Sequence, residues 1–124
     1  MNFAPKVPEV HARVVSSGQL PVVYTLEGEI SSPKLPEYPR REYELQVAKD
    51  AEFKGQVKAF DLGTNGKFII DIKSELVNDP NFGLKPGDRI FARGHACNIL
   101  GTSEWSGPVE AGIYNPRELE SGED

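Results

Sequence analysis

Glycine and proline divide the chain at such regular intervals that no long helix fits between them. The 124 residues include 12 glycines and 10 prolines, and the longest segment without either runs from Arg40 to Lys54. Proline in a helix interior costs about 3 kcal/mol and glycine about 1 kcal/mol relative to alanine. This spacing excludes helix bundles and coiled coils and leaves little room for βαβ units. The chain length is typical of one domain and sufficient for a hydrophobic core without disulfides.

Between these breaks, apolar and polar residues alternate with the period of two that indicates half-buried strands. Seven such segments are predicted: Val10–Val15, Val22–Ile30, Glu42–Val47, Gln56–Phe60, Lys67–Lys73, Arg89–Cys97 and Val109–Tyr114. The inward phase of these strands carries a predicted core of Tyr24, Leu26, Tyr43, Leu45, Val47, Phe68, Ile70, Ile72, Ile90 and Ala92. Short strands separated by frequent turns are typical of a small β-sandwich or barrel, so we predict an all-β fold of about seven antiparallel strands.

The turns and the two ends set the predicted domain organisation. Asn65-Gly66 is the strongest turn signal and favours a tight hairpin, and Ser74–Phe82 has room for one helical turn. Three predicted regions follow in order: an N-terminal arm over residues 1–9, a β-sandwich over 10–114, and an acidic C-terminal tail over 115–124.

Three segments in the second half of the sequence resemble the repeats of bacterial Ig-like domains. They are the acidic Asn-Gly turn segment Ala59–Asp71, the Leu-x-x-Gly-Asp-x-Ile-x-Ala pattern of Leu84–Ala92, and the Trp-containing loop Gly101–Val109. The resemblance implies an Ig-like β-sandwich that acts as a structural or adhesive module and not as an enzyme. A single such domain with extended ends is similar to accessory domains of phage particles, which implies a decoration or surface-assembly subunit on a virion or extracellular surface.

Charge favours protein partners over nucleic acid, although one strand leaves a rival interpretation open. The net charge is −5 and the isoelectric point is near 5.1, and an acidic balance disfavours phosphate contacts. However, one face of the strand Arg89–Cys97 alternates basic and aromatic side chains: Arg89, Phe91, Arg93 and His95. Lys54, Lys58 and Phe60 could add to this face. Such a face is typical of OB-folds that bind single-stranded nucleic acid, which is the alternative function.

Reactive side chains are too few, and too poorly spaced, to indicate catalysis. His95 and Cys97 share one strand face, but no third residue is marked as an orienting partner, and His11 adds only a weak metal-site pattern. Asp61, Asn65 and Asp71 lack the spacing of an EF-hand loop, so turn capping is the simpler interpretation, and a calcium ion between loops of an Ig-like domain is the alternative. We therefore expect no catalytic residue, no cofactor and no metal. The single cysteine also excludes an internal disulfide.

The remaining candidates are residues that could contact partners. Apolar side chains interrupt the polar arm and tail at Phe3, Val7 and Leu119, which suggests contacts with a protein or with further copies of the chain. Trp105 is predicted either to pack over one end of the sandwich or to stack on a ligand, and the resemblance to phage accessory domains implies a cell-surface glycan or protein as a partner. No apolar run is long enough to predict a membrane span, and the N-terminus lacks the pattern of a secretion signal.

Overall fold

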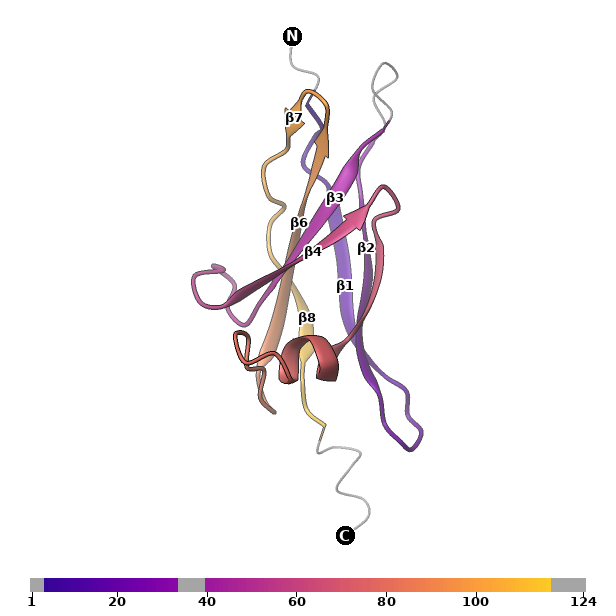
Figure 1. Cartoon of the computed structure of the whole chain (residues 1–124), viewed down its shortest axis with the longest axis vertical. Helices are drawn as coiled ribbons and strands as arrows, with labels where there is room; N and C mark the ends of the chain where they lie inside the picture. Colours follow the sequence, from indigo (N-terminus) through magenta and orange to yellow (C-terminus); the bar gives the residue numbers. More distant parts are fainter. Residues whose placement is uncertain (1–3, 34–39, 117–124) are drawn as a thin grey trace.

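The computed structural model describes residues 4–33 and 40–116 (Figure 1). Strands dominate these residues and one short helical segment interrupts them. The elements in chain order are β1 (Glu9–Ser16), β2 (Tyr24–Ser31), β3 (Glu42–Ala48), β4 (Val57–Gly63), β5 (Lys67–Asp71), η1 (Lys73–Val77), β6 (Arg89–Asn98), β7 (Gly101–Thr102) and β8 (Val109–Ile113).

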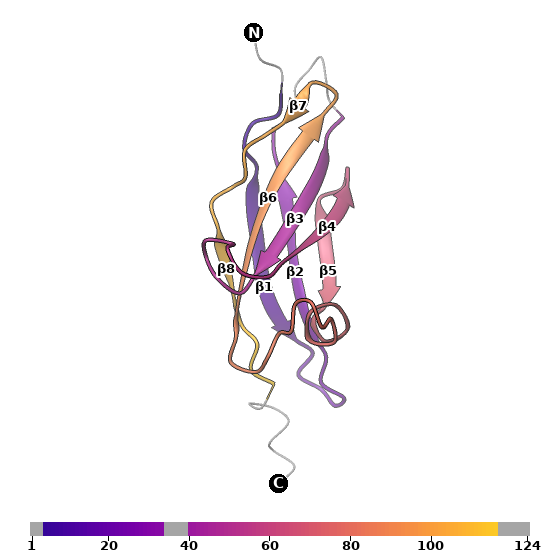
Figure 2. The same cartoon turned by 60° about the vertical axis from the view of Figure 1, so that its left-hand side comes forward.

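The strands form two antiparallel sheets that face each other along the length of an elongated molecule (Figure 2). One sheet has the order β1-β2-β5. The other has the order β4-β3-β6, and both β7 and β8 pair with β6. The predicted all-β sandwich is therefore confirmed as an architecture.

The core lies between the sheets, where the predicted inward phases meet. Nine of the ten predicted core residues are buried, and Tyr24 is half-buried against them. Each fully buried Leu or Ile side chain contributes roughly 1.5–3 kcal/mol, so this interior dominates the stability. Gly94 of β6 permits the close approach of the sheets, because a Cβ there would lie 2.5 Å from Ile30 Cδ1 and 3.2 Å from Val10 Cγ2.

The Asn-Gly turn does not close the predicted hairpin. Its flanking strands belong to different sheets: β4 pairs with β3, and β5 pairs with β2. The turn is instead a crossover that uses positive φ at Gly63 (64°) and Gly66 (80°). The Ile30 amide donates to the Gly66 carbonyl at 2.9 Å, and a Cβ on Gly66 would overlap the Ile30 carbonyl. The local signal identified the turn, but the partner of each strand depends on contacts distant in sequence.

Two smaller features also bear on the predictions. The segment predicted as a loop after Cys97 includes the two-residue strand β7, whereas the single helical turn occurs as η1 within the expected region.

At the ends of the described chain, Pro5, Pro8 and Pro116 are buried, and the Tyr24 hydroxyl donates to the Pro116 carbonyl at 3.3 Å. The described parts of the arm and the tail therefore pack on the sandwich. Phe3 and Leu119 lie outside the described residues.

Candidate functional site

The outer surface of β3 and β6 brings together most of the predicted polar site. The strand register places Glu44 opposite His95 and Gln46 opposite Arg93. Both pairs are bonded side chain to side chain: His95 Nε2 lies 2.7 Å from Glu44 Oε1, and Arg93 Nε donates to Gln46 Oε1 at 2.8 Å. Opposed polar pairs of this kind stabilise antiparallel strands. We call this surface the β3–β6 face.

Two aromatic side chains from neighbouring segments cover the β3–β6 face. Trp105 stacks on His95, with ring centres 3.7 Å apart and planes inclined by 10°. The guanidinium of Arg93 lies 4.7 Å from the centre of the Trp105 ring and 4.4 Å from the centre of the Phe53 ring. We call these four residues the aromatic–cation stack. Trp105 therefore packs on the outward side chains of β6 and not, as the sequence predicted, over an end of the sandwich, and its side chain remains partly exposed.

The segment that carries Trp105 is hydrogen-bonded to the backbone of β6 through Ser103 and Ser106. The Ser106 amide donates to the Gly94 carbonyl at 2.8 Å, and the Gly94 amide donates to the buried Ser106 Oγ at 2.9 Å. Ser103 makes the same kind of reciprocal contact with Ala96, through its amide at 2.8 Å and its Oγ at 2.9 Å. The serines on either side of Trp105 therefore fix its segment as an addition to the sheet.

Phe53 is positioned by a tight turn between β3 and β4. The Asp50 carboxylate accepts hydrogen bonds from the amides of Lys54 (3.0 Å) and Gly55 (3.3 Å), and chiefly the Lys54 bond lowers the pKa of Asp50. Phe53 adopts a φ of 57°, which is uncommon for a residue with a side chain, and is buried. Such strain persists only where surrounding contacts compensate for it, and here the Arg93 contact is one of them.

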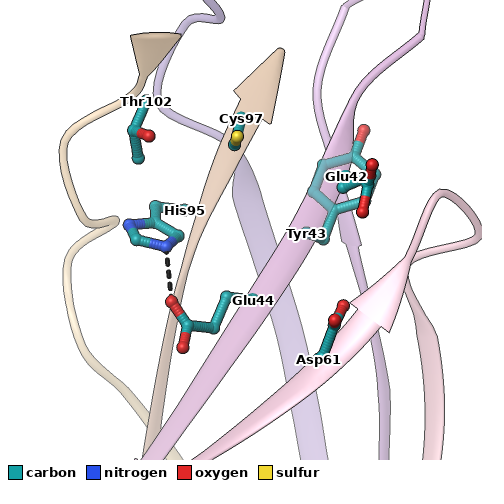
Figure 3. Close-up of a pocket in the computed structure, with 7 residues that line it drawn as sticks. All are labelled: Glu42, Tyr43, Glu44, Asp61, His95, Cys97 and Thr102. Carbon is teal, nitrogen blue, oxygen red and sulfur yellow. Dashed lines mark hydrogen bonds and ion pairs between the residues drawn. The ribbon is translucent and has the colours of Figure 1, made fainter. Parts of the chain in front are cut away.

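A surface pocket of about 380 Å³ adjoins the stack (Figure 3). Its lining comes from β3, β4, β6 and β7: Glu42, Tyr43, Glu44, Asp61, His95, Cys97 and Thr102. Glu44 is bonded to His95, Glu42 lies 3.6 Å from Arg40, and Asp61 Oδ1 accepts a hydrogen bond from the Gly63 amide at 2.9 Å. Three carboxylates against one imidazole give the pocket an acidic lining, so it suits a cationic group better than an anion.

The same pocket offers no nucleophilic arrangement among its described contacts. A cysteine nucleophile needs a histidine within hydrogen-bond reach. His95 Nε2 instead engages Glu44, and Cys97 Sγ lies 3.7 Å from the Asn98 carbonyl. Figure 3 shows the imidazole directed toward Glu44. We therefore assign no catalytic role to this pair.

The predicted basic face on β6 is partly correct. Its outward residues do alternate with the buried Ile90, Ala92, Gly94 and Ala96, since Arg89, Phe91, Arg93 and His95 occupy the opposite phase. Arg89 is exposed, 3.9 Å from Glu110, and Phe91 is half-buried. Val7, predicted as a contact residue, is 51% exposed and lies outside this face in the arm.

Lys58 and Phe60 do not join this face, contrary to the sequence interpretation. Their register partners are Val47 and Leu45, which are buried, so both side chains lie on the inner side of the sheet. Phe60 packs on the core, and Lys58 Nζ forms ion pairs with Glu75 at 3.2 Å and Asp79 at 3.0 Å. Burial opposes the charged amine, but these partners outweigh it and raise the pKa of Lys58.

Carboxylates around the crossover cap backbone amides. Asp71 Oδ1 accepts hydrogen bonds from the amides of Lys73 (3.0 Å) and Ser74 (3.3 Å), and Asp61 caps Gly63. Within residues 4–33 and 40–116, no cluster of three His, Cys, Asp or Glu side chains is arranged to hold a metal ion.

Sequence reasoning missed Glu44, Gln46 and Phe53 as members of the β3–β6 face. The alternation in β3 indicates that Glu44 and Gln46 point outward, but only the register with β6 shows which residues they meet. Phe53 gives no periodic signal because it lies in a turn.

Comparisons with known proteins do not assign the chain to a family. No model of a protein family matches the sequence, and no curated protein is significantly similar to it. The described residues include no helix of the length and hydrophobicity needed to cross a membrane.

Proposed function

We propose that the chain is an Ig-like module with a structural or adhesive role. The strand order supports the Ig-like interpretation. A sheet β1-β2-β5 that faces β4-β3-β6-β8 has the order of strands A-B-E and C′-C-F-G in Ig-type sandwiches. The function proposed with it is that of a virion decoration or surface-assembly subunit, which binds protein partners or further copies of itself and adheres weakly to cell-surface protein or glycan.

One observation carries this proposal: charged side chains of β4 and β6 have polar partners within the chain, whereas several large aliphatic side chains outside the core are exposed. Arg93, His95 and Lys58 each have polar partners within the chain. By contrast, several large aliphatic residues are exposed, with Ile99 at 85% and Leu20 at 77%. Exposed apolar side chains that gather in patches mark contacts with other macromolecules.

The nucleic-acid alternative draws less support from the same contacts. Binding of single strands requires cations and aromatic faces that are available to backbone and bases. Arg93 contacts the rings of both Phe53 and Trp105, and His95 stacks on the indole, so these groups are already engaged within the chain. Separate sheets also differ from the partly open Greek-key barrel of an OB-fold.

Two measurements on the full chain test the proposal. Sedimentation velocity over a concentration series should show self-association, or binding assays with immobilised glycans and intact cells should show adhesion. Electrophoretic shift of a single-stranded oligonucleotide should show no binding at about 150 mM salt, a concentration that retains specific nucleic-acid complexes. A micromolar shift that is lost in Arg89→Gln but kept in the matched variant Arg13→Gln, on the other sheet, would instead establish the OB-type function.

A further inference from the structure

Among the described strands that lie at a sheet edge, β5 is the one that lacks a protecting feature. Edge strands present unpaired amide and carbonyl groups, which proteins protect with bulges, inward-pointing charges or covering segments. β4 has the inward-pointing Lys58 and a register shift opposite Tyr43 and Glu44, β8 has a register shift opposite Ile90 and Phe91, and β1 lies alongside β8. The register of β5 with β2 runs without a shift. Figure 2 shows β5 at the lateral margin of its sheet.

Every second residue of β5 directs its backbone amide and carbonyl to this open edge. The Ile30 amide donates to the Gly66 carbonyl at 2.9 Å, in continuation of the register between β2 and β5. In an antiparallel ladder, opposed pairs that exchange hydrogen bonds alternate with pairs that do not. The residues two and four positions after Gly66 therefore bond to β2. The backbone groups of the alternate residues point away from β2: Lys67, Ile69 and Asp71.

The same three residues carry exposed side chains whose order is complementary to itself. Lys67, Ile69 and Asp71 are exposed, with Ile69 at 76%, whereas Phe68 and Ile70 are buried. In an antiparallel pairing of β5 with β5 of a second copy, about a two-fold axis at Ile69, Lys67 lies opposite Asp71 of the second copy. Ile69 then lies opposite its own equivalent. Opposite charges and aliphatic residues that face each other across antiparallel strands are stabilising pairs.

The charges beside β5 are compatible with this pairing. Lys67 lies opposite Glu29 of β2 in the register, so in the pair of copies it is flanked by its own Glu29 and by Asp71 of the second copy. Asp71 Oδ1 accepts hydrogen bonds from the amides of Lys73 and Ser74. These bonds engage one of the two carboxylate oxygens, and the other is left to face a lysine across the edge.

From this edge, and resting on the proposed assembly function, we propose that two copies of this chain associate through β5. The three-stranded sheets of the two copies then form one continuous antiparallel sheet. Such a contact is isologous, so it closes at a dimer. Two strands of five residues bury less surface than the roughly 1,200 Å² of a standard interface, which predicts a dissociation constant on the order of 100 μM.

Charge reversal on the full chain tests the register. Lys67→Glu and Asp71→Lys each set like charges opposite each other at both ends of the pairing. Sedimentation velocity should show that each variant alone associates at least about fivefold more weakly than the native chain. An equimolar mixture should recover the association, because every reversed charge then faces an opposite one. Arg13→Glu is the matched control for Lys67→Glu: it makes the same change of net charge at an exposed site on β1, two strands from the edge, and should leave association unchanged.

A backbone variant tests the strand pairing independently of charge. The amide of Ile69 faces the open edge, so Ile69→Pro removes no hydrogen bond to β2, and edge strands accept proline at such positions. Circular dichroism and thermal melting should show a folded chain, and sedimentation should show no dimer up to about 1 mM. If proline unfolds the chain, Ile69→Glu takes its place, because it sets two like charges against each other at the two-fold axis while the exposed site leaves the core intact.

Other outcomes overturn the proposal in distinguishable ways. A native chain that stays monomeric up to about 1 mM has no contact through β5, although adhesion to glycans or cells would still sustain the proposed function. A native dimer that persists unchanged in Lys67→Glu and in the Ile69 variant uses another surface, so assembly stands and the β5 contact is wrong. Native species larger than a dimer contradict an isologous contact. If both charge variants are monomeric and their mixture stays monomeric, Lys67 does not face Asp71 and the register is wrong.

Discussion

The outer surfaces of the two sheets differ in how their side chains are used. On the β3–β6 face, charged and aromatic side chains bond across strands and are covered by Trp105 and Phe53. On the outer surface of β1-β2-β5, the register sets Arg13 opposite Glu27 and Ile69 next to the same residue, with Ile69 76% exposed. On the β3–β6 face, these side chains pack against one another above the sheet. The outer surface of β1-β2-β5 is an ordinary solvated sheet face.

This difference teaches that residue type alone does not identify a binding surface. Arginine, histidine, phenylalanine and tryptophan are the residues that ligand sites favour, and here they stabilise the domain. The large aliphatic residues with the greatest exposure lie away from this face, at Ile99 (85%), Leu20 (77%) and Ile69 (76%).

The largest expected effect tests the covered surface directly. Trp105→Ala removes the ring that stacks on His95 and contacts Arg93. Truncation of a buried aromatic residue costs roughly 3–5 kcal/mol, and because Trp105 is half-buried we expect a loss of about 2–3 kcal/mol in the free energy of unfolding. Urea denaturation measures it. Ile69→Ala on the other sheet should change the free energy of unfolding by less than about 0.5 kcal/mol. Equal effects for the two variants would show that the two outer surfaces do not differ in their contribution to stability.

A second prediction concerns the inner side of the same strand. Gly94→Ala introduces a Cβ that would lie 2.5 Å from Ile30 Cδ1, the flexible end of a side chain on the opposite sheet. Overpacking of a core costs typically 1–3 kcal/mol, and we expect a loss of about 1–2 kcal/mol by urea denaturation. Gly107→Ala is the control, because no atom lies within 4 Å of its Cβ position. A stabilised Gly94→Ala variant would show that the sheets can separate at no cost.

The sequence determined the interior far better than the surfaces. Alternation identified Leu45, Val47 and Ile90 as core because every second residue of a strand shares one environment. The same reasoning placed Lys58 and Phe60 on the wrong side of the sheet, because β4 is an edge strand in which polar and apolar residues occur at both sets of alternate positions. The partners of Glu44 and His95 depend on the pairing of β3 with β6, about fifty residues apart, and no local pattern encodes that register.

The smallest expected effect concerns the tie between the two sheets. Lys58 of β4 binds Asp79, which follows η1, and so joins an edge of one sheet to the segment that continues from β5 of the other. The hydrogen bond from Lys58, together with that from the Asn81 amide, lowers the pKa of Asp79 below its ordinary value of 3.8. Because the folded pKa is depressed, the stabilisation is complete above the unfolded pKa and is lost as the pH falls through the folded value.

Asp79→Asn should therefore flatten the decline of stability with pH in the acid range. Thermal melting of the native chain and the variant between about pH 5 and pH 2 measures the two slopes, since the carboxyl groups that fold with lowered pKa values cause acid denaturation. At neutral pH the variant should melt lower than the native chain, and the gap should narrow as the pH decreases. Asp88→Asn is the matched carboxyl variant, because it neutralises a carboxylate that accepts a hydrogen bond from the Lys85 amide and has no ion-pair partner like Lys58 among the described contacts. If Asp79→Asn follows the native acid profile without narrowing, the ion pair between Lys58 and Asp79 does not contribute a pH-dependent link between the sheets.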